Sequence, residues 1–203
     1  MENTVDKLSK TIPDSGNRTE LMEGGGMRDI QAENGRCDLM PLDLIAKLIE
    51  EAYLIDKPTL CDYFTYSQQR AVCKILNLIH NYIYEGEPNN LIEAIFIFIP
   101  QSYSIRSVNM DNLDPVLAET LSTAILDLSR RYKEGAEKYV ERNWEKGILV
   151  KSCLDSAVRH LLKWCREDSD ENHSSAFLWN IVTAIWMHFN NAGALVDMPF
   201  TKQ

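Results

Sequence analysis

The stretch that decides the fold lies at residues 114–128 and reads DPVLAETLSTAILDL. It opens with Asp114-Pro115, a capping carboxylate followed by the residue that is favoured at the first position of a helix. The apolar residues after it recur at helical spacing, which predicts a long helix running into the charged stretch at residues 132–147, YKEGAEKYVERNWEKG. The apolar stripe consists of Val116, Leu117, Leu121, Ile125, Leu126 and Leu128.

The same spacing predicts four further helices around this one. One begins after Pro41 and is ended by Pro58, and a second covers about residues 67–84. Two more cover about Ser152 to Cys165 and, from a cap at Ser174 or Ser175, about as far as Phe189. Residues 91–100, LIEAIFIFIP, form a buried element that the pattern leaves open between helix and strand, and residues 101–112 are polar and irregular.

The last predicted helix is apolar on nearly all sides. Such a helix lies either at the centre of a bundle or against a second subunit. The pattern as a whole predicts an all-α fold, a helical bundle, and the last helix favours a homo-oligomer.

Composition limits the kind of partner. The chain has 203 residues and a formal charge of −9, which argues against a protein that wraps duplex nucleic acid, because such proteins present a basic face to the phosphates. A small anionic ligand remains possible where local basic groups or a divalent cation balance its charge.

The five cysteines are widely spaced and never form a CxxC pair, which is typical of reduced, mostly buried thiols in a cytosolic protein. The N-terminal sequence has no apolar signal-peptide core, and no apolar run is long enough to span a bilayer. We therefore expect a cytoplasmic protein without a membrane partner.

Residues 1–36 are polar, contain Gly24-Gly25-Gly26 and show no sustained apolar period. They are predicted to be a flexible tail. Residues 37–203 are predicted to form a single α-helical domain.

Two groups of carboxylates stand out as candidate metal ligands. Glu134, Glu137 and Glu141 would share one face of the long helix if it continues so far, and residues 167–171, EDSDE, stand where the next helix should end. Acidic residues are unfavourable at that end of a helix dipole, and a bound cation would resolve the conflict. By spacing alone, a solvated face and a surface loop are the better explanations of the two groups.

The sequence resembles the dATP/dGTP diphosphohydrolases found largely in phages and prophages, which are related to the all-α nucleotide pyrophosphohydrolases of the MazG kind. The resemblance rests on residues 132–147, on RHL at residues 159–161, and on a short piece around residues 36–50. Further matches are Trp164, Glu167, Asp170, Glu171, His173, Trp179 and Asn180. It implies a helical bundle of the pyrophosphohydrolase kind with an inserted, mainly helical segment.

The resemblance also implies a reaction: metal-dependent cleavage of a purine deoxynucleoside triphosphate to the monophosphate and pyrophosphate. Its catalytic residues would be Glu137, Glu167 and Asp170. A Mg²⁺ or Mn²⁺ ion would bind to oxygen ligands from Glu134, Glu137, Glu167, Asp170 and Glu171. Substrate-binding residues would be Lys138, Arg142, Asn143, Trp144, Arg159, His160, His173 and Asn180.

Several of these side chains have a structural explanation as well. His160 and His173 could donate hydrogen bonds to phosphate or orient a neighbouring ligand. Alternatively, they are helix-end residues hydrogen-bonded to a carbonyl. Trp179, on an apolar helix, fits a core position as well as a base platform. His80 and His188 have no motif around them and are expected to be structural.

The chain departs from the family pattern in two places. About residues 55–120 separate the first matched piece from the second, and Ala176 stands where a second histidine is expected, after a loop without the usual glycines. These departures favour an alternative function: a nucleotide-binding protein on the same scaffold with reduced turnover, acting as a sensor or sequestering a nucleotide.

Overall fold

The computed structural model describes residues 19–21, 27–29, 35–103 and 113–190. The chain divides into two compact units, residues 1–34 and residues 35–203. In the first unit, strands β1 (Thr19–Leu21) and β2 (Met27–Asp29) pair antiparallel, with Thr19 opposite Asp29. Most of the predicted flexible tail lies outside the described residues, so that prediction stays a prediction.

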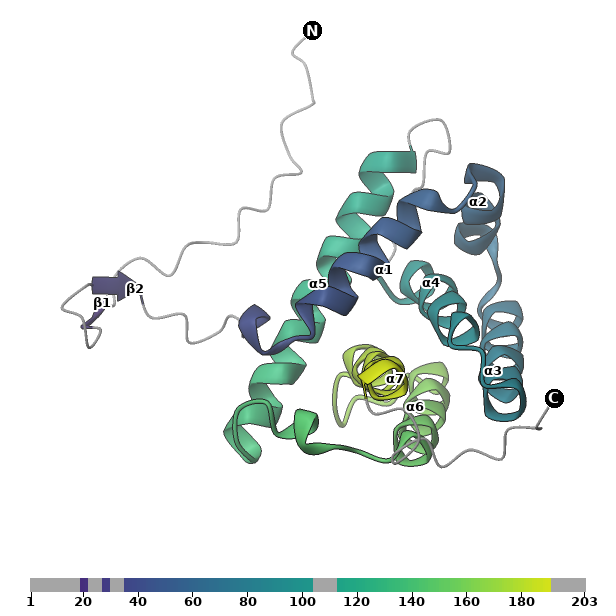
Figure 1. Ribbon diagram of the computed structural model, residues 1–203. Coiled ribbons are helices and arrows are strands. Elements are labelled where there is room, and N and C mark those ends of the chain that lie inside the picture. The colour runs from purple at the N-terminus through teal and green to yellow at the C-terminus, as the bar shows by residue number, and fades with distance from the viewer. Residues whose placement is uncertain (1–18, 22–26, 30–34, 104–112, 191–203) are drawn as a thin grey trace, which may run out of the picture. The chain divides into compact units, whose positions relative to one another are not determined.

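The described part of the second unit is helical throughout, which confirms the predicted all-α class (Figure 1). It comprises η1 (Cys37–Leu39), α1 (Leu42–Leu54), α2 (Lys57–Thr65), α3 (Gln68–Glu85), α4 (Asn89–Tyr103), α5 (Leu113–Lys138), η3 (Asn143–Lys146), α6 (Val150–Cys165) and α7 (His173–Asn190). The predicted helices after Pro41, at about 67–84 and at about 152–165 correspond to α1, α3 and α6.

Helix α7 lies at the centre of this unit (Figure 1). It packs against α4, α5 and α6, and buried side chains occur around its whole circumference, from Ser175 to Met187. The bundle therefore accounts for the apolar character of α7 within a single chain, and this helix gives no reason to expect a second subunit.

Two helix boundaries show how side chains set the ends of these elements. Ser67 caps α3 by accepting a hydrogen bond from the backbone N–H of Arg70, and Gly86 ends it in a left-handed conformation with φ of 77°. For α7 the predicted cap at Ser174 or Ser175 is wrong. The cap is Asn172, whose side-chain oxygen accepts from the N–H of Ser175 at 3.0 Å.

The segment after α1 also differs from the prediction. Pro58 does not end α1, which stops at Leu54, but lies in the first turn of the additional helix α2, where a missing N–H does no harm. Residues 91–100, left open between helix and strand, belong to α4, which packs between α3, α5 and α7 with nine buried residues. A helix enclosed on every side has no polar face to reveal its period.

Helix α5 is the long helix predicted from residues 114–128, but both of its ends differ by a few residues. It begins at Leu113, so Asp114 lies in its first turn and not before it. It ends at Lys138, and Arg142 then adopts a left-handed conformation with φ of 53°. Glu141 is therefore outside the helix, and its predicted alignment with Glu134 and Glu137 is wrong.

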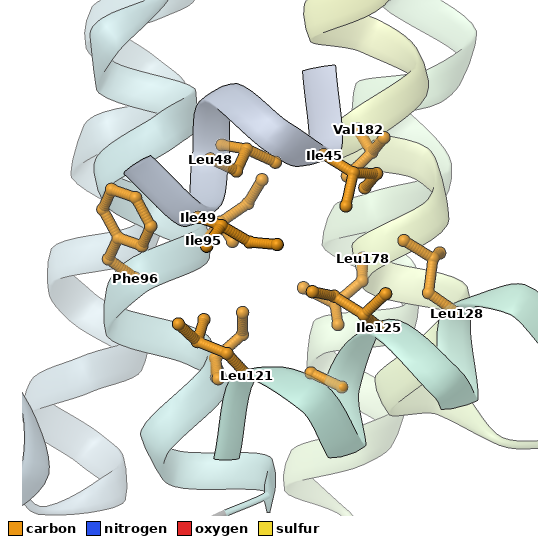
Figure 2. A pocket seen from close by; sticks show the side chains of 12 residues that line it. Ile45, Leu48, Ile49, Ile95, Phe96, Leu121, Ile125, Leu128, Leu178 and Val182 are labelled. Carbon is orange, nitrogen blue, oxygen red and sulfur yellow. The ribbon is translucent and has the colours of Figure 1, made fainter. Parts of the chain in front are cut away.

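A small cavity of about 30 Å³ lies between α1, α4, α5 and α7 (Figure 2). Its twelve lining residues are all hydrophobic, among them Leu48, Phe96 and Leu128. This cavity is a gap in the core packing and offers no polar group to a ligand.

No described helix is both long and apolar enough to cross a membrane. Among the described residues the free cysteines differ in burial: Cys153 is buried, Cys165 is half-buried, and Cys37 and Cys73 are exposed. The prediction of mostly buried thiols is thus only partly right.

Candidate functional site

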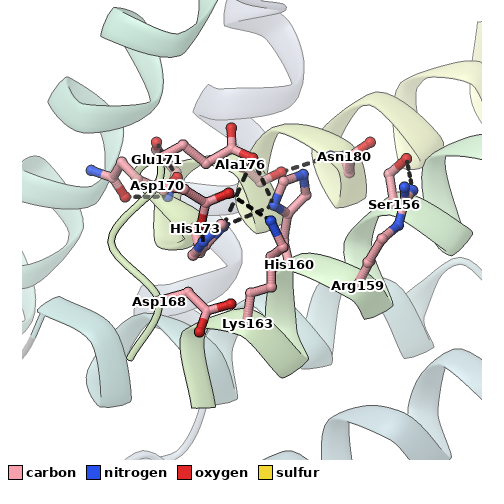
Figure 3. Close-up of polar contacts among 12 residues, drawn as sticks. Ser156, Arg159, His160, Lys163, Asp168, Asp170, Glu171, His173, Ala176 and Asn180 are labelled. Carbon is pink, nitrogen blue, oxygen red and sulfur yellow. Dashed lines mark hydrogen bonds and ion pairs between the residues drawn. The ribbon is translucent and has the colours of Figure 1, made fainter. Parts of the chain in front are cut away.

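Two histidines face each other where the end of α6 meets the start of α7 (Figure 3). The Nδ1 atoms of His160 and His173 are 3.1 Å apart. His173 is buried, with 1% of its side chain exposed, and His160 is half-buried with 16% exposed. The short connection through residues 166–172 folds α7 back along α6, and this brings together two rings that are thirteen positions apart in the sequence.

Two carboxylates, each held by a cation, surround this pair (Figure 3). Asp170 accepts from Lys163 at 2.7 Å with one oxygen and contacts His173 Nε2 at 2.8 Å with the other. Glu171 accepts from Arg131 at 2.7 Å through Oε2, and its Oε1 lies 3.5 Å from His160 Nδ1 and 3.9 Å from His173 Nδ1. Each carboxylate therefore has one oxygen fixed by a positive charge and one directed at the histidines.

These surroundings shift the proton affinities of the cluster. Burial lowers the pKa of His160, against the opposing effect of the Glu171 carboxylate. Hydrogen bonds from Lys163 and then His173 lower the pKa of Asp170 to about 2. At neutral pH the cluster therefore presents an ionised Asp170 and favours a neutral His160.

Arg131 is a site residue that the sequence analysis missed. Its guanidinium donates to Glu134 at 3.1 Å and to Glu171 at 2.7 Å, so it connects α5 to the loop before α7. The available signal was its position: it precedes Glu134 by three residues, on the same face of the helix.

The structure brings together only some of the predicted metal ligands. Within the described residues, two groups have donor atoms close enough to hold one ion: His160, Glu171 and His173, and Asp168, Asp170 and His173. Glu134, Glu137 and Glu167 belong to neither group. Glu137 is exposed and 4.0 Å from Lys133, and Glu167 is exposed with φ of 59°.

These donors fit a divalent cation, although they differ from the all-oxygen set that was predicted. Glu171 supplies a carboxylate oxygen to the group with His160 and His173, and Asp168 and Asp170 supply oxygens to the other group, which also contains His173. Mg²⁺ is commonly held by one or two carboxylates together with substrate phosphates, and each group offers at least one carboxylate. The nitrogen donors suit transition metals better.

A second feature lies beside this cluster: a pocket of about 290 Å³ lined mainly by aromatic and small residues. Tyr132, Gly135 and Ala136 of α5 contribute one wall, and Trp179 of α7 contributes another. The remaining lining residues are Leu39, Tyr139, Val140, Arg142, Asn143, Trp144 and Ile148. Trp179, which the sequence left open between core and ligand platform, is half-buried and lines the pocket.

Helix α5 contributes residues to both the pocket and the charged cluster. Arg131, which contacts Glu171, and Gly135, which lines the pocket, are four residues apart and so lie on the same face of the helix. An elongated ligand with a flat end and an anionic end matches this arrangement.

The other predicted substrate residues are distributed unevenly. Arg142, Asn143 and Trp144 line the pocket, whereas Asn180 is buried and its amide donates to the carbonyl of Ala176 within α7. Arg159 points away from the histidines, donating to Asp155 and Ser156 at 3.0 Å each (Figure 3). Lys138 is exposed, with its ammonium 5.2 Å from the centre of the Tyr139 ring.

The segment at residues 36–40 closes one side of the pocket. The indole N–H of Trp144 donates to the carbonyl of Leu39 at 3.3 Å, and Arg142 donates to the carbonyl of Asp38 at 3.0 Å. Arg36 pairs with Glu141 at 2.8 Å and with Asp38 at 2.7 Å. These contacts tie the short N-terminal matched piece to the motif at residues 132–147.

Comparison with known proteins gives one family match. Residues 103–197 match the family model described as dATP/dGTP diphosphohydrolase, N-terminal. No curated protein and no solved structure matches the chain. The matched segment contains α5, η3, α6 and α7, and hence the histidine cluster and most of the pocket wall. This match over residues 103–197 supports the resemblance to the dATP/dGTP diphosphohydrolase family that the motifs between Tyr132 and Asn180 indicated.

Proposed function

We propose that this protein hydrolyses a purine deoxynucleoside triphosphate, dATP or dGTP, between its α- and β-phosphates. The observation that carries the proposal is that α5 contributes to both an aromatic pocket and a charged cluster within the segment that matches the family model. The products would be the deoxynucleoside monophosphate and pyrophosphate.

The pocket would take the purine. Its volume of about 290 Å³ is sufficient for a flat bicyclic base, and Trp179 and Tyr139 offer ring faces for stacking. Asn143 supplies an amide that can both donate to and accept from a base edge. Trp144 is buried and hydrogen-bonded to the carbonyl of Leu39, so it would hold the pocket wall in place without contacting the base.

The triphosphate would extend from the pocket towards Arg131, Lys163 and the two histidines. Arg131 is well suited to phosphate oxygens because its planar guanidinium can donate two parallel hydrogen bonds. In the structure these donors are directed at Glu134 and Glu171, so substrate would compete for them. Arg159 could bind a phosphate oxygen only after its hydrogen bond to Asp155 is broken.

The divalent cation, Mg²⁺ or Mn²⁺, would bind phosphate oxygens together with a carboxylate of the cluster, either Asp170 or Glu171, which belong to different groups of potential ligands. When bound, such an ion neutralises phosphate charge and lowers the pKa of a coordinated water. Lys163 and Arg131 hold one oxygen of each carboxylate, which keeps the other oxygen directed into the cluster.

The reaction itself would be an in-line displacement at the α-phosphorus. The oxygen of water forms a bond to that phosphorus, the bond to the bridging oxygen breaks, and pyrophosphate leaves with the electron pair. A carboxylate takes the proton released from water. We assign this role to Glu134, which is exposed and lies beside Arg131 at the border between pocket and cluster.

One observation favours a second function, nucleotide binding with little or no turnover. Glu137 and Glu167, which the family motif places among the catalytic residues, lie outside both groups of potential ligands in the described residues. A protein with this site would still bind a purine nucleotide, as a sensor or as a sequestering agent.

The two functions differ in one experiment. Purified protein is incubated with each deoxynucleoside triphosphate and Mg²⁺ or Mn²⁺, and the products are separated by chromatography. Hydrolysis predicts monophosphate and pyrophosphate from dATP or dGTP. Unhydrolysed nucleotide together with a raised melting temperature of the protein supports binding without turnover. A melting temperature that no nucleotide changes contradicts both functions, because any ligand of the native state must stabilise it.

Matched variants locate the reaction in this site. Glu171→Gln removes a carboxylate charge from the cluster and should lower kcat by at least about ten-fold. Glu50→Gln, at an exposed position on α1, is the control and should have wild-type activity. Equal activity of the two variants would exclude Glu171 from the mechanism.

A further inference from the structure

We infer that His160, His173 and Glu171 form a binding site for a transition-metal ion of the Zn²⁺ class, and that this site binds metal in the absence of nucleotide. The inference goes beyond the hydrolase proposal, whose Mg²⁺ or Mn²⁺ ion depends on phosphate oxygens. It concerns metal binding alone and is tested without substrate.

The geometry of the three donor atoms carries the inference. His160 Nδ1 and His173 Nδ1 are 3.1 Å apart, and Glu171 Oε1 is 3.5 Å and 3.9 Å from them. The point equidistant from three atoms with these separations is about 2 Å from each, the length of a Zn–N or Zn–O bond. The separations of the three donor atoms therefore match those around one bound ion.

The second ring nitrogen of His173 supports the same conclusion. His173 Nε2 lies 2.8 Å from Asp170 Oδ1, and Lys163 fixes the other Asp170 oxygen. An ionised carboxylate at this position accepts a hydrogen bond from the Nε2 proton, which leaves the lone pair of Nδ1 directed into the cluster. Carboxylate–histidine–metal arrangements of this kind orient ligands in known metal sites.

The other two donors are positioned by the protein as well. Arg131 holds Glu171 through Oε2, which leaves Oε1 facing the histidines. His160 is half-buried, and its Nδ1 faces His173 Nδ1 at 3.1 Å.

The donor set determines which metal the site prefers. Two imidazole nitrogens and one carboxylate suit Zn²⁺, Co²⁺ or Mn²⁺, whereas Mg²⁺ prefers oxygen ligands and retains several waters. Three protein ligands also leave at least one coordination position open, as in catalytic zinc sites.

The test is direct metal binding. Protein is freed of metal with a chelator, dialysed, and titrated with Zn²⁺ and with Mg²⁺ by isothermal titration calorimetry. One Zn²⁺ per chain and at least 100-fold weaker Mg²⁺ binding are expected. Co²⁺ serves as the spectroscopic probe: nitrogen and oxygen ligation gives visible d–d bands without the sulfur charge-transfer band that binding to the exposed Cys37 or Cys73 would produce.

Three variants assign the ligands. His160→Gln, at a half-buried position, should weaken Zn²⁺ binding by at least ten-fold, and Asp170→Asn should weaken it by about 10–100-fold through the orientation of His173. His80→Gln is the control, because His80 is exposed on α3 and contacts Tyr84. Its Zn²⁺ affinity should equal that of the wild type, and circular dichroism checks that each variant is folded.

Two outcomes would overturn the inference. In the first, titration of the wild-type protein shows no binding of one Zn²⁺ per chain. His160 and His173 would then be a hydrogen-bonded pair without metal. In the other, Zn²⁺ binds but His160→Gln and His80→Gln have equal affinities. Either result leaves hydrolysis with Mg²⁺ possible, and absence of hydrolysis would leave the Zn²⁺ site standing, so the two proposals fail separately.

Discussion

Arg131 on α5 and Glu171, two residues before α7, are joined by an ion pair of 2.7 Å. This pair connects the helix that forms one pocket wall to the loop that carries the carboxylates. Both side chains are about one-third exposed, so the pair contributes little to folding. Its main consequence is the position of Glu171 relative to the two histidines.

Removing this guanidinium should affect activity more than stability. Arg131→Gln is expected to lower kcat/KM for the preferred nucleotide by at least ten-fold, because Glu171 loses its support and the phosphates lose a donor. The free energy of unfolding should fall by no more than about 1 kcal/mol. The adjacent Arg130→Gln, which removes a pair with Asp127 outside the cluster, is the control. Similar losses of activity in both variants would contradict this role.

The pocket makes a separate prediction about base binding. Trp179→Ala should raise KM or Kd for the nucleotide by about ten-fold, since stacking of a base on an aromatic ring contributes about 1–3 kcal/mol. Trp179→Phe keeps a ring face and should recover most of the affinity. Binding of inorganic triphosphate, which has no base, should be the same for all three proteins. Equal nucleotide affinity of the alanine variant and the wild type would exclude Trp179 from the base site.

Two glycines allow a matched test of local packing. A Cβ on Gly35 would lie 1.9 Å from Ser129 Oγ and 2.5 Å from the backbone nitrogen of Arg130, whereas a Cβ on Gly135 would meet nothing within 4 Å. Gly35→Ala should destabilise the protein, because the added Cβ would push the segment around Gly35 away from Ser129. That movement would distort the hydrogen bond from the Arg36 N–H to the Ser129 carbonyl. Gly135→Ala, inside α5, should stabilise it by about 0.5–1 kcal/mol. Urea denaturation measures both, and changes of the same sign would contradict the close packing around Gly35.

A half-buried histidine outside the site should make stability depend on pH. Burial lowers the pKa of His188 below its usual 6.5, against an opposing effect of Glu87, and its Nδ1 is 3.0 Å from the Tyr82 hydroxyl. As pH falls through 6.5, the unfolded chain takes up a proton that the folded chain resists, so the free energy of unfolding decreases. His160, whose pKa is also lowered, acts in the same direction.

Replacing His188 should therefore flatten the pH profile. His188→Gln is expected to reduce the loss of stability between pH 7 and pH 5, measured by urea denaturation at each pH. His80→Gln, at an exposed position, should leave the profile of the wild type unchanged. A steeper profile in His188→Gln would mean that folding raises the pKa of this histidine instead of lowering it.

The sequence predicted the helices with one polar face, and it also predicted the almost wholly apolar α7, but it left α4 undecided and missed α2. α1, α3 and α6 were found because their apolar residues alternate with charged ones at helical spacing. α4 was left open between helix and strand because it is enclosed on all sides, and α2 was missed because Pro58 was taken as a terminator and not as a first-turn residue. The Asn172 cap of α7 was missed because two serines follow it closely.

The site was only partly predictable for a related reason. Asp170, Glu171, His160 and His173 are close in sequence to a single helix junction, and that junction brings them together. Whether Glu134 and Glu137 face the same junction depends on the rotation and packing of α5, which residue spacing does not specify. The family motif identified the segment, while the partnership of Arg131 with Glu171 required the tertiary structure.

The proposed reaction is attack of water on the α-phosphorus of a purine deoxynucleoside triphosphate. Hydrolysis of dGTP and of dATP in H₂¹⁸O, followed by mass spectrometry of the products, tests it most directly. We expect one ¹⁸O atom in the monophosphate and none in the pyrophosphate. Label in the pyrophosphate, or products other than monophosphate and pyrophosphate, would contradict attack at the α-phosphorus.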